Sequence, residues 1–322
     1  MRAMLTENEG SPDLALYLGD MAYESGTDAE FTNSYFAPYA SVLQNTVVWP
    51  ALGNHDGLST TSGECFPPCT ASSTGPYYDA FVLPQRAQAG GVASGTEAYY
   101  SFDYGNVHFI ALNSSEVSRS STGPMATWLT SDLRSTAQPW VIAFWHHPPY
   151  TKGTHDSDAE GDLVQMRERI VPILEAGGVD LVLNGHSHGY ERSYLIDGAH
   201  GTPTPSVATL TAEGHVIDGG DGRPTGDGPY VKSPGRNANE GAVYVVAGHG
   251  GRTGGGDYGH PVMSFSENVE GSLLVDVDAD ALTVRNVLIT GVVSDTFTIR
   301  KGGLPLRAGS ANLRTGVSVG QP

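Results

Sequence analysis

Four short groups of residues in this chain carry side chains that metal ions bind. They are Gly19-Asp20-Met21-Ala22-Tyr23, Gly53-Asn54-His55-Asp56, His146, and Gly185-His186-Ser187-His188. Carboxylate and phenolate oxygens suit Fe(III), whereas imidazole nitrogens suit Zn(II), Fe(II) or Mn(II). An aspartate can bridge two ions about 3.5–4 Å apart, and such a pair activates water for an in-line displacement at phosphorus. The residue types therefore indicate a two-metal centre for phosphoryl chemistry.

Each group on its own has an ordinary structural explanation. A Gly-Asp pair after a strand is usually a turn, Gly-Asn-His-Asp can form an Asx turn, and a single His-x-His is more often structural than ligating. The positions of the groups favour a functional interpretation, because each group directly follows an apolar run of strand length. Ligands of α/β sheets gather beyond the carboxyl ends of the strands, so we expect the four groups to meet there.

The elements that must position these groups alternate along the chain. Apolar runs predict strands over residues 14–18, 46–52, 140–145 and 179–183, and a hairpin over residues 98–112. Apolar residues at helical spacing predict a helix from Asp162 to the Gly177-Gly178 pair, and a second helix is expected over residues 124–134. These alternations favour an α/β fold.

We expect one catalytic domain over residues 1–301. Within it, residues 195–240 form a long loop excursion, because they are polar, rich in Gly and Pro, and weakly periodic. Residues 242–300 form a β-rich closing part, and residues 302–322 are predicted to be a flexible tail.

The overall composition excludes several partners. The chain has 322 residues, 39% of them hydrophobic, and a formal net charge of −18. So acidic a protein does not hold nucleic acid through a general basic field. No apolar run approaches about 18 residues, so no membrane span is expected. The two cysteines, Cys65 and Cys69, could close a small disulfide loop, which would favour an oxidising compartment, or remain free thiols.

The order of the four groups resembles the motif blocks of the purple acid phosphatases, a family of calcineurin-like metallophosphoesterases. The matching blocks are Gly19-Asp20-x-x-Tyr23, Gly53-Asn54-His55-Asp56, His146-x-Pro148 and Gly185-His186-x-His188, continued by Gly189-Tyr190-Glu191-Arg192-Ser193. Tyr23 is the most specific element, because most other metallophosphoesterases lack a tyrosine there. The resemblance covers residues 11–300 and implies an α/β/β/α sandwich of two mixed sheets.

The resemblance also implies a role for each matched residue. Asp20 would bridge the two ions. The ferric ion would be bound by Tyr23 and His188, and a divalent zinc, iron or manganese ion by Asn54, His146 and His186.

Three further histidines have roles under the same resemblance. His55 would contact the phosphate or protonate the leaving oxygen. His155 would be a second histidine that contacts the substrate, although a solvated loop position is an equal alternative. His147 is interpreted as a packing or supporting residue rather than a ligand.

One block of the family is absent. It is Asp-x-Gly at the end of the strand before that of Asp20, and its aspartate is a ferric ligand. Only nineteen residues precede Asp20, and none of them forms Asp-x-Gly. Either the sequence is truncated, or the strand is lost and one metal position is weak. In both cases the sheet would have an open edge or slot, so we predict poor folding or weak iron binding.

The resemblance implies an acid phosphatase that hydrolyses small phosphomonoesters by attack of a metal-bound hydroxide. A phosphodiesterase acting on nucleotides or phospholipid headgroups would use the same ligands. A non-catalytic relative is the third hypothesis, and the absent aspartate is its only support. If a signal peptide lies upstream with the absent strand, the protein is secreted or periplasmic.

Overall fold

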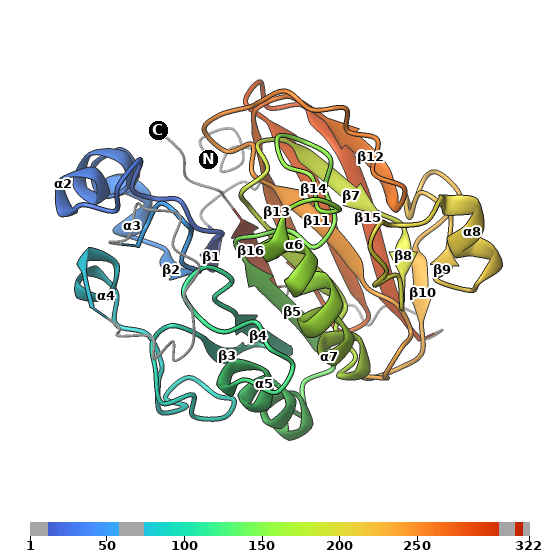
Figure 1. Ribbon diagram of the computed structural model, residues 1–322, viewed down its shortest axis with the longest axis horizontal. Helices are drawn as coiled ribbons and strands as arrows, with labels where there is room; N and C mark the ends of the chain where they lie inside the picture. Colours follow the sequence, from blue (N-terminus) through green and yellow to red (C-terminus); the bar gives the residue numbers. More distant parts are fainter. Residues whose placement is uncertain (1–11, 58–73, 303–312, 318–322) are drawn as a thin grey trace.

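The computed structural model describes residues 12–57, 74–302 and 313–317, and it consists mainly of two seven-stranded mixed sheets (Figure 1). Cys65 and Cys69 lie outside these ranges. No helix within them is both long and apolar enough to cross a membrane. The predicted α/β/β/α sandwich of two mixed sheets is confirmed.

The first sheet carries the strand that leads to Asp20. In spatial order its strands are β10 (Tyr230–Lys232), β15 (Val293–Lys301), β14 (Ala281–Leu288), β13 (Gly271–Val277), β16 (Leu313–Val317), β1 (Leu14–Tyr17) and β2 (Val47–Pro50). β1 runs parallel to β2, with Leu14 beside Val47. The loops that follow these two strands therefore leave the same edge of the sheet.

The second sheet carries the strands that lead to His146 and His186. In spatial order its strands are β12 (Met263–Glu267), β7 (Tyr190–Ser193), β11 (Val243–Ala247), β6 (Leu181–Asn184), β5 (Trp140–Trp145), β4 (Val107–Ala111) and β3 (Tyr100–Tyr104). β4, β5, β6 and β11 are parallel, whereas β3, β7 and β12 are antiparallel to their neighbours. This sheet confirms the strands and the hairpin expected over residues 98–183.

The position of β16 contradicts two predictions. Leu313–Val317 pairs in parallel with β1 and antiparallel with β13, so the flexible tail predicted over residues 302–322 is wrong for this segment. The predicted slot beside β1 is also absent among the described strands, because β16 occupies that position. The segment has little sequence signal of its own, and its strand exists because two neighbours supply backbone partners on both sides.

The helices lie beside the sheets. A continuous helical segment runs through α6 (Gly161–Gln165), η2 (Met166–Ile170) and α7 (Val171–Ala176), and confirms the helix expected from Asp162. Its middle turn is π-helical, and the irregularity is next to Pro172, which has no backbone N–H to donate. α5 (Pro124–Ser135) confirms the other predicted helix.

A helix near β1 was not predicted. It comprises α2 (Asp28–Glu30), η1 (Phe31–Phe36) and α3 (Ala37–Leu43). Thr27 and Glu30 form a capping box at its start. Its buried Tyr35 packs edge-on against Tyr17 of β1, with ring centroids 4.8 Å apart. The four-residue spacing of Phe31, Tyr35 and Tyr39 could have indicated it.

The excursion over residues 195–240 contains short elements rather than one continuous loop. They are β8 (Leu195–Ile196), α8 (Val207–Ala212), β9 (Val216–Asp218) and β10, and β8 pairs with β9. A further short helix, α4 (Pro76–Ala80), precedes β3.

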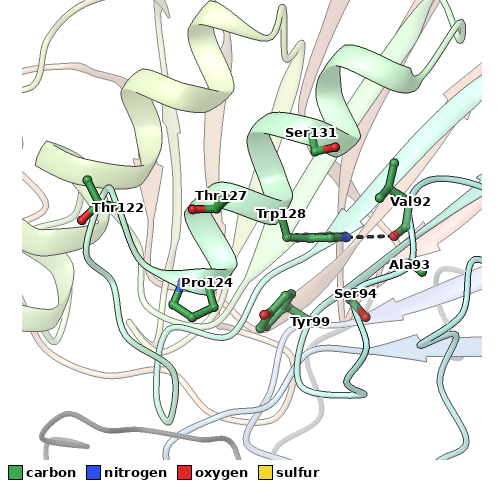
Figure 2. Close-up of a pocket in the computed structure, with 9 residues that line it drawn as sticks. All are labelled: Val92, Ala93, Ser94, Tyr99, Thr122, Pro124, Thr127, Trp128 and Ser131. Atoms are coloured by element: carbon green, nitrogen blue, oxygen red, sulfur yellow. Dashed lines mark hydrogen bonds between the residues drawn. The ribbon is translucent and has the colours of Figure 1, made fainter.

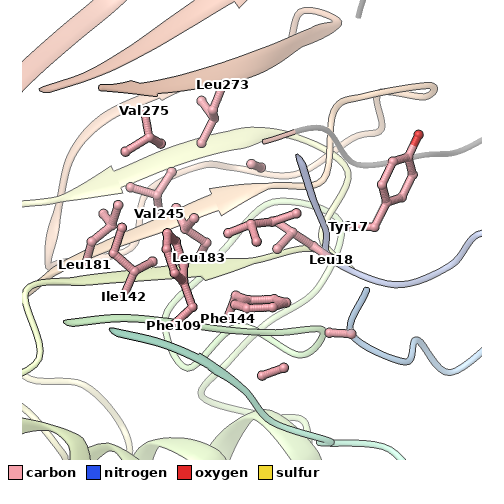
Figure 3. Packing of buried hydrophobic residues seen from close by; sticks show 14 of the residues in the cluster. Tyr17, Leu18, Phe109, Ile142, Phe144, Leu181, Leu183, Val245, Leu273 and Val275 are labelled. Atoms are coloured by element: carbon pink, nitrogen blue, oxygen red, sulfur yellow. The ribbon is translucent and has the colours of Figure 1, made fainter. Parts of the chain in front are cut away.

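Two apolar layers hold the structure together. The first lies between the sheets and includes Phe109, Phe144 and Leu183 of the second sheet together with Leu273 and Val275 of the first (Figure 3). The second lies between the second sheet and the helices. β5 supplies both layers, because its six residues alternate between the two faces and are all buried. The packed sheets therefore fix the loops at their carboxyl ends.

Candidate metal centre

The loops that follow β1, β2 and β5 are in close contact. A Cβ atom on Gly19 would lie 2.6 Å from the Gly53 Cα and 2.7 Å from the His146 Nδ1. Gly19 also has a φ of 92°, which L-residues with side chains rarely adopt. A glycine before Asp20 therefore lets loops from the two sheets approach each other.

Two of the predicted ligands have strained backbones. Asp20 has a φ of 59° and His186 a φ of 65°, in the left-handed region that costs energy for residues other than glycine. Such strain persists only where neighbouring groups enforce it, and it is frequent at functional sites. The structure thus holds both side chains in orientations that an ordinary turn would not give.

Asp56 holds the Asp20 loop in place. Its carboxylate accepts backbone N–H groups from Asp20 at 2.7 Å, Met21 at 2.7 Å, Ala22 at 3.0 Å and Gly53 at 2.9 Å. Burial, with the nearby Asp20 charge, raises the pKa of Asp56 to about 6. The sequence alone did not indicate this positioning role.

Asn54, His146 and His186 form one group of converging ligand atoms. The His146 Nε2 lies 2.8 Å from the Asn54 Oδ1, and the His186 Nδ1 lies 3.0 Å from that oxygen and 3.1 Å from the His146 Nε2. Ligands about 2.1 Å from one ion and at right angles to each other are about 3 Å apart. The spacing therefore fits the coordination sphere of a single metal ion.

The second nitrogen of His146 supports this interpretation. Its Nδ1 lies 2.7 Å from the Leu18 carbonyl oxygen, which can only accept, so Nδ1 carries the hydrogen. The Nε2 then offers its lone pair to the group. A histidine oriented in this way by a backbone carbonyl is typical of metal ligands.

Tyr23 and His188 form a second group on the other side of Asp20. The Tyr23 hydroxyl donates to the Asp20 Oδ2 at 2.7 Å and lies 3.4 Å from the His188 Nε2. The same Asp20 oxygen lies 3.2 Å from the His146 Nε2. Asp20 therefore contacts both groups, as a bridging carboxylate must.

The protonation states of this group follow from burial. Burial, reinforced by the Asp20 charge, raises the pKa of the Tyr23 phenol. Burial alone would also raise the pKa of Asp20, but the charge and hydrogen bond of His146 hold that pKa below its usual value. Without a cation the phenol stays protonated, so a strongly acidic ion such as Fe(III) is needed to make it a phenolate ligand.

His55 lies at the Tyr23 side of the centre. Its ring stacks on the Tyr23 ring with centroids 4.3 Å apart, and its backbone N–H donates to the Asp20 Oδ1 at 3.0 Å. Its Nδ1 lies 2.9 Å from the Glu24 carbonyl oxygen, so Nδ1 is the donor. Proton donation from the Nε2 would then require the imidazolium form.

His155 lies at the opposite side of the centre. Its ring stacks on that of His186 at 3.8 Å, and its Nδ1 lies 2.9 Å from the Glu160 Oε2. The same carboxylate oxygen is 3.9 Å from the His186 Nε2. His155, Glu160 and His186 could together hold a metal ion. The structure thus brings His155 to the centre, and it adds Glu160, which no sequence motif marked.

His147 is buried next to the group formed by Asn54, His146 and His186. Its Nδ1 lies 2.8 Å from the Ser114 Oγ, and its ring is 4.3 Å from that of His186. His146, His147 and His186 form a second histidine group with metal-binding spacing. Burial, aided by the neighbouring His186, lowers the pKa of His147 well below its usual value, so this ring is neutral. The Ser114 contact agrees with a supporting role.

A pocket elsewhere has no comparable chemistry. It has a volume of about 540 Å³ and lies between α5 and residues 92–99, where the Trp128 indole donates to the Val92 carbonyl oxygen at 2.8 Å (Figure 2). Its lining contains no charged side chain and none of the predicted site residues. This pocket therefore offers no alternative to the loops around Asp20 as the candidate site.

Polar loops and a histidine-rich centre at the carboxyl ends of two packed mixed sheets define a metallophosphoesterase. The calcineurin-like phosphoesterase family matches residues 2–190, and the chain belongs to that family. The family implies bound metal ions. Membership supports a phosphoesterase function.

Curated relatives show which kind of phosphoesterase the chain resembles. The chain is 26% identical over 230 residues to purple acid phosphatase 15 of Arabidopsis thaliana, a match that covers 63% of this chain and 40% of the relative. Purple acid phosphatase 23 of the same plant is 28% identical over 214 residues, covering 57% and 42%. The chain thus spans about two fifths of the length of these relatives.

A solved structure supports the fold. Purple acid phosphatase PPD1 from yellow lupin seeds superposes with a TM-score of 0.66 over 96% of this chain and 52% of its own. Its sequence identity is 17%, so this likeness concerns the fold alone.

Proposed function

We propose that this protein is a binuclear-metal acid phosphatase that hydrolyses phosphomonoesters. The observation that carries the proposal is the position of the Asp20 carboxylate between two ligand groups. Tyr23 donates to it from one side, and His146 lies 3.2 Å from it on the other. A site for a single ion would not need two ligand groups on either side of one carboxylate.

The residues present fit a pair of unlike ions. Tyr23 and His188 offer a phenol oxygen and an imidazole nitrogen beside Asp20, a set that suits Fe(III). Asn54, His146 and His186 offer an amide oxygen and two imidazole nitrogens, a set that suits zinc, iron or manganese in the divalent state. Two such ions would supply positive charge for the phosphate and Lewis-acid activation of water.

The chain's own groups would orient and protonate the substrate. His55 and His155 lie on opposite sides of the centre, against Tyr23 and His186 respectively. Either ring in its imidazolium form could donate a proton to a phosphate oxygen or to the leaving alcohol. Glu160 would orient the His155 ring, because its carboxylate lies 2.9 Å from the His155 Nδ1.

The test combines a spectrum with an assay. Protein purified with iron should show a visible absorption band from tyrosinate–iron charge transfer, and Tyr23→Phe should abolish it. The control is Tyr104→Phe, because Tyr104 is exposed on β3. The wild type should hydrolyse phenyl phosphate faster than bis-phenyl phosphate. Loss of the band only in Tyr104→Phe, a preference for the diester, or no hydrolysis of either ester would each contradict the proposal.

A further inference from the structure

The loop after β5, residues 146–160, carries His146 at its start and His155 and Glu160 near its end. The loop consists of turns and bends, without helix or strand. The His155 ring nevertheless stacks on the His186 ring with centroids 3.8 Å apart, and the His155 Nδ1 lies 2.9 Å from the Glu160 Oε2. Because such a loop has little order of its own, contacts from other segments must fix the His155 ring at the centre.

Arg167 of η2 supplies such contacts. Its side chain is completely buried. Its Nη1 donates to the Pro149 carbonyl oxygen at 3.1 Å and to the Ser157 Oγ at 3.3 Å. Its Nη2 donates to the Asp158 Oδ1 at 2.9 Å. His155 lies between these contacts in the chain, so a single guanidinium holds the loop on both sides of that residue.

The excursion over residues 195–240 reaches the same guanidinium and the same carboxylate. The Thr202 Oγ1 accepts from the Arg167 Nη2 at 2.6 Å. Thr204 donates to the Asp158 Oδ1 through its backbone N–H at 2.9 Å and through its hydroxyl at 2.8 Å. Hydrogen bonds to charged groups are the strong ones, and a buried network of them favours one geometry. The loop that carries His155 is therefore joined both to the helix and to the excursion.

We propose that Arg167 is a positioning residue, which holds the loop after β5 so that the His155 ring stays beside His186 and the bound substrate. This inference rests on the proposed phosphatase function, in which His155 contacts the substrate. Arg167 acts through His155, because its hydrogen bonds reach the loop and the excursion. A displacement of about 1 Å in an aligned group can cost on the order of 100-fold in rate. Arg167 also lies in a π-helical turn, a feature frequent at functional sites.

A double-mutant cycle with His155 tests the inference on the metal-loaded protein. Arg167→Lys keeps the positive charge but lacks the planar group that reaches both sides of the loop. It should lower kcat for phenyl phosphate on the order of 10- to 100-fold and leave the metal content unchanged. In the His155→Ala background the same substitution should change kcat less than about 2-fold, because the ring that it positions is gone. The control is Arg169→Ala, which removes an exposed arginine of η2 and should change neither kcat nor metal content.

A second variant covers the case in which Arg167→Lys does not fold. Thr204→Val removes the hydroxyl that donates to Asp158 and keeps the shape of the side chain. It should lower kcat by a smaller factor, on the order of 3- to 10-fold, since it removes one hydrogen bond to a charged group. This loss should also disappear in the His155→Ala background.

Chemical modification provides a readout independent of turnover. Diethyl pyrocarbonate modifies accessible histidine rings, and peptide mass spectrometry gives the rate at each one. Arg167→Lys and Thr204→Val should raise the rate at His155 at least about 3-fold, because the released loop opens more often. His215 is the internal reference and should keep its rate, since its side chain is exposed to a similar degree, 34% against 31% for His155.

The outcomes separate this inference from the proposed function. No loss of kcat, equal losses in both His155 backgrounds, or an unchanged rate of His155 modification would each overturn the positioning role and leave the phosphatase proposal intact. If the wild type does not hydrolyse phenyl phosphate, the phosphatase proposal fails, and the rates of His155 modification alone then decide the role of Arg167.

Discussion

The two ends of β6 carry buried polar clusters of opposite kinds. At its amino end, the Asp180 carboxylate receives the Lys232 Nζ at 2.6 Å and the Lys301 Nζ at 2.7 Å. At its carboxyl end, His186 meets Asn54 and His146. Both clusters are buried. The cluster at the amino end contains its own cations, whereas the cluster at the carboxyl end consists of ligand atoms with lone pairs.

The difference separates a structural cluster from a binding site. The lysines at the amino end have acceptors beyond Asp180, because Lys232 also donates to the Val179 and Gly241 carbonyl oxygens. A buried polar cluster that satisfies itself needs no ligand. At the carboxyl end, converging lone pairs repel one another until a proton or a cation lies between them. His186, with its strained backbone, follows the carboxyl end of β6, where the ligand atoms converge.

Asp20→Asn should have the largest effect on function. The amide keeps the size of the side chain but loses the negative charge that both ligand groups share. We expect kcat/KM for phenyl phosphate to fall on the order of 1000-fold, equivalent to several kcal/mol of transition-state stabilisation. Metal content by mass spectrometry should fall with it, while Asp28→Asn, at an exposed helix position, should change neither. Two retained ions per chain would contradict the bridging role.

Asp180→Ala should have the largest effect on stability. It leaves two buried ammonium groups without their carboxylate, which costs about 3–5 kcal/mol in free energy of unfolding. Chemical denaturation measures this cost, and kcat of the remaining folded protein should be unchanged. Asp276→Ala is the control, because Asp276 pairs with Arg285 at 2.7 Å in a partly exposed position and should cost less than about 1 kcal/mol. Similar losses in both variants would remove the contrast between the clusters.

Glu191 provides a smaller, pH-dependent test of a third kind of buried cluster. Its carboxylate accepts the Thr151 hydroxyl and the Lys152 backbone N–H, with no cation in contact among the described residues. Burial raises the pKa of Glu191 to about 7 from 4.5. The carboxyl is protonated in both states below pH 4.5, and its ionisation opposes folding as the pH rises.

Wild-type stability should therefore be highest, with respect to Glu191, below pH 4.5 and should decline as the pH rises through about 7. Glu191→Gln cannot ionise and should lack this decline. The free energies of unfolding of the two proteins should diverge by up to about 3 kcal/mol between pH 4.5 and 8. Glu213→Gln, at an exposed residue, should follow the wild-type profile. Parallel profiles for wild type and Glu191→Gln would show that the carboxyl titrates normally.

Much of the fold could be predicted from local pattern. β5 has the predicted bounds, Trp140–Trp145, because a buried strand of a parallel sheet is apolar on both faces. The helix from Asp162 follows from apolar spacing. β16 could not be predicted, since its partners come from segments far apart in the chain.

The candidate site also contains residues that the sequence predicts and residues that it does not. Asp20, Asn54 and His186 follow strands within recognisable motifs, so their types and order could be identified. Glu160 belongs to no motif and lies in a loop rich in charged residues. Only the folded chain brings Glu160 to His186 and Gly254 to His188.

The sequence by itself determined which side chains would be available for metal ions and that each would follow a strand. Those properties are local, because a strand and the turn after it depend on neighbouring residues. The tertiary structure alone decided that Asp20 lies between two ligand groups, that β16 pairs with β1, and that Glu160 lies near His186. Contacts between distant segments arise from packing two sheets face to face, and no single segment encodes that packing.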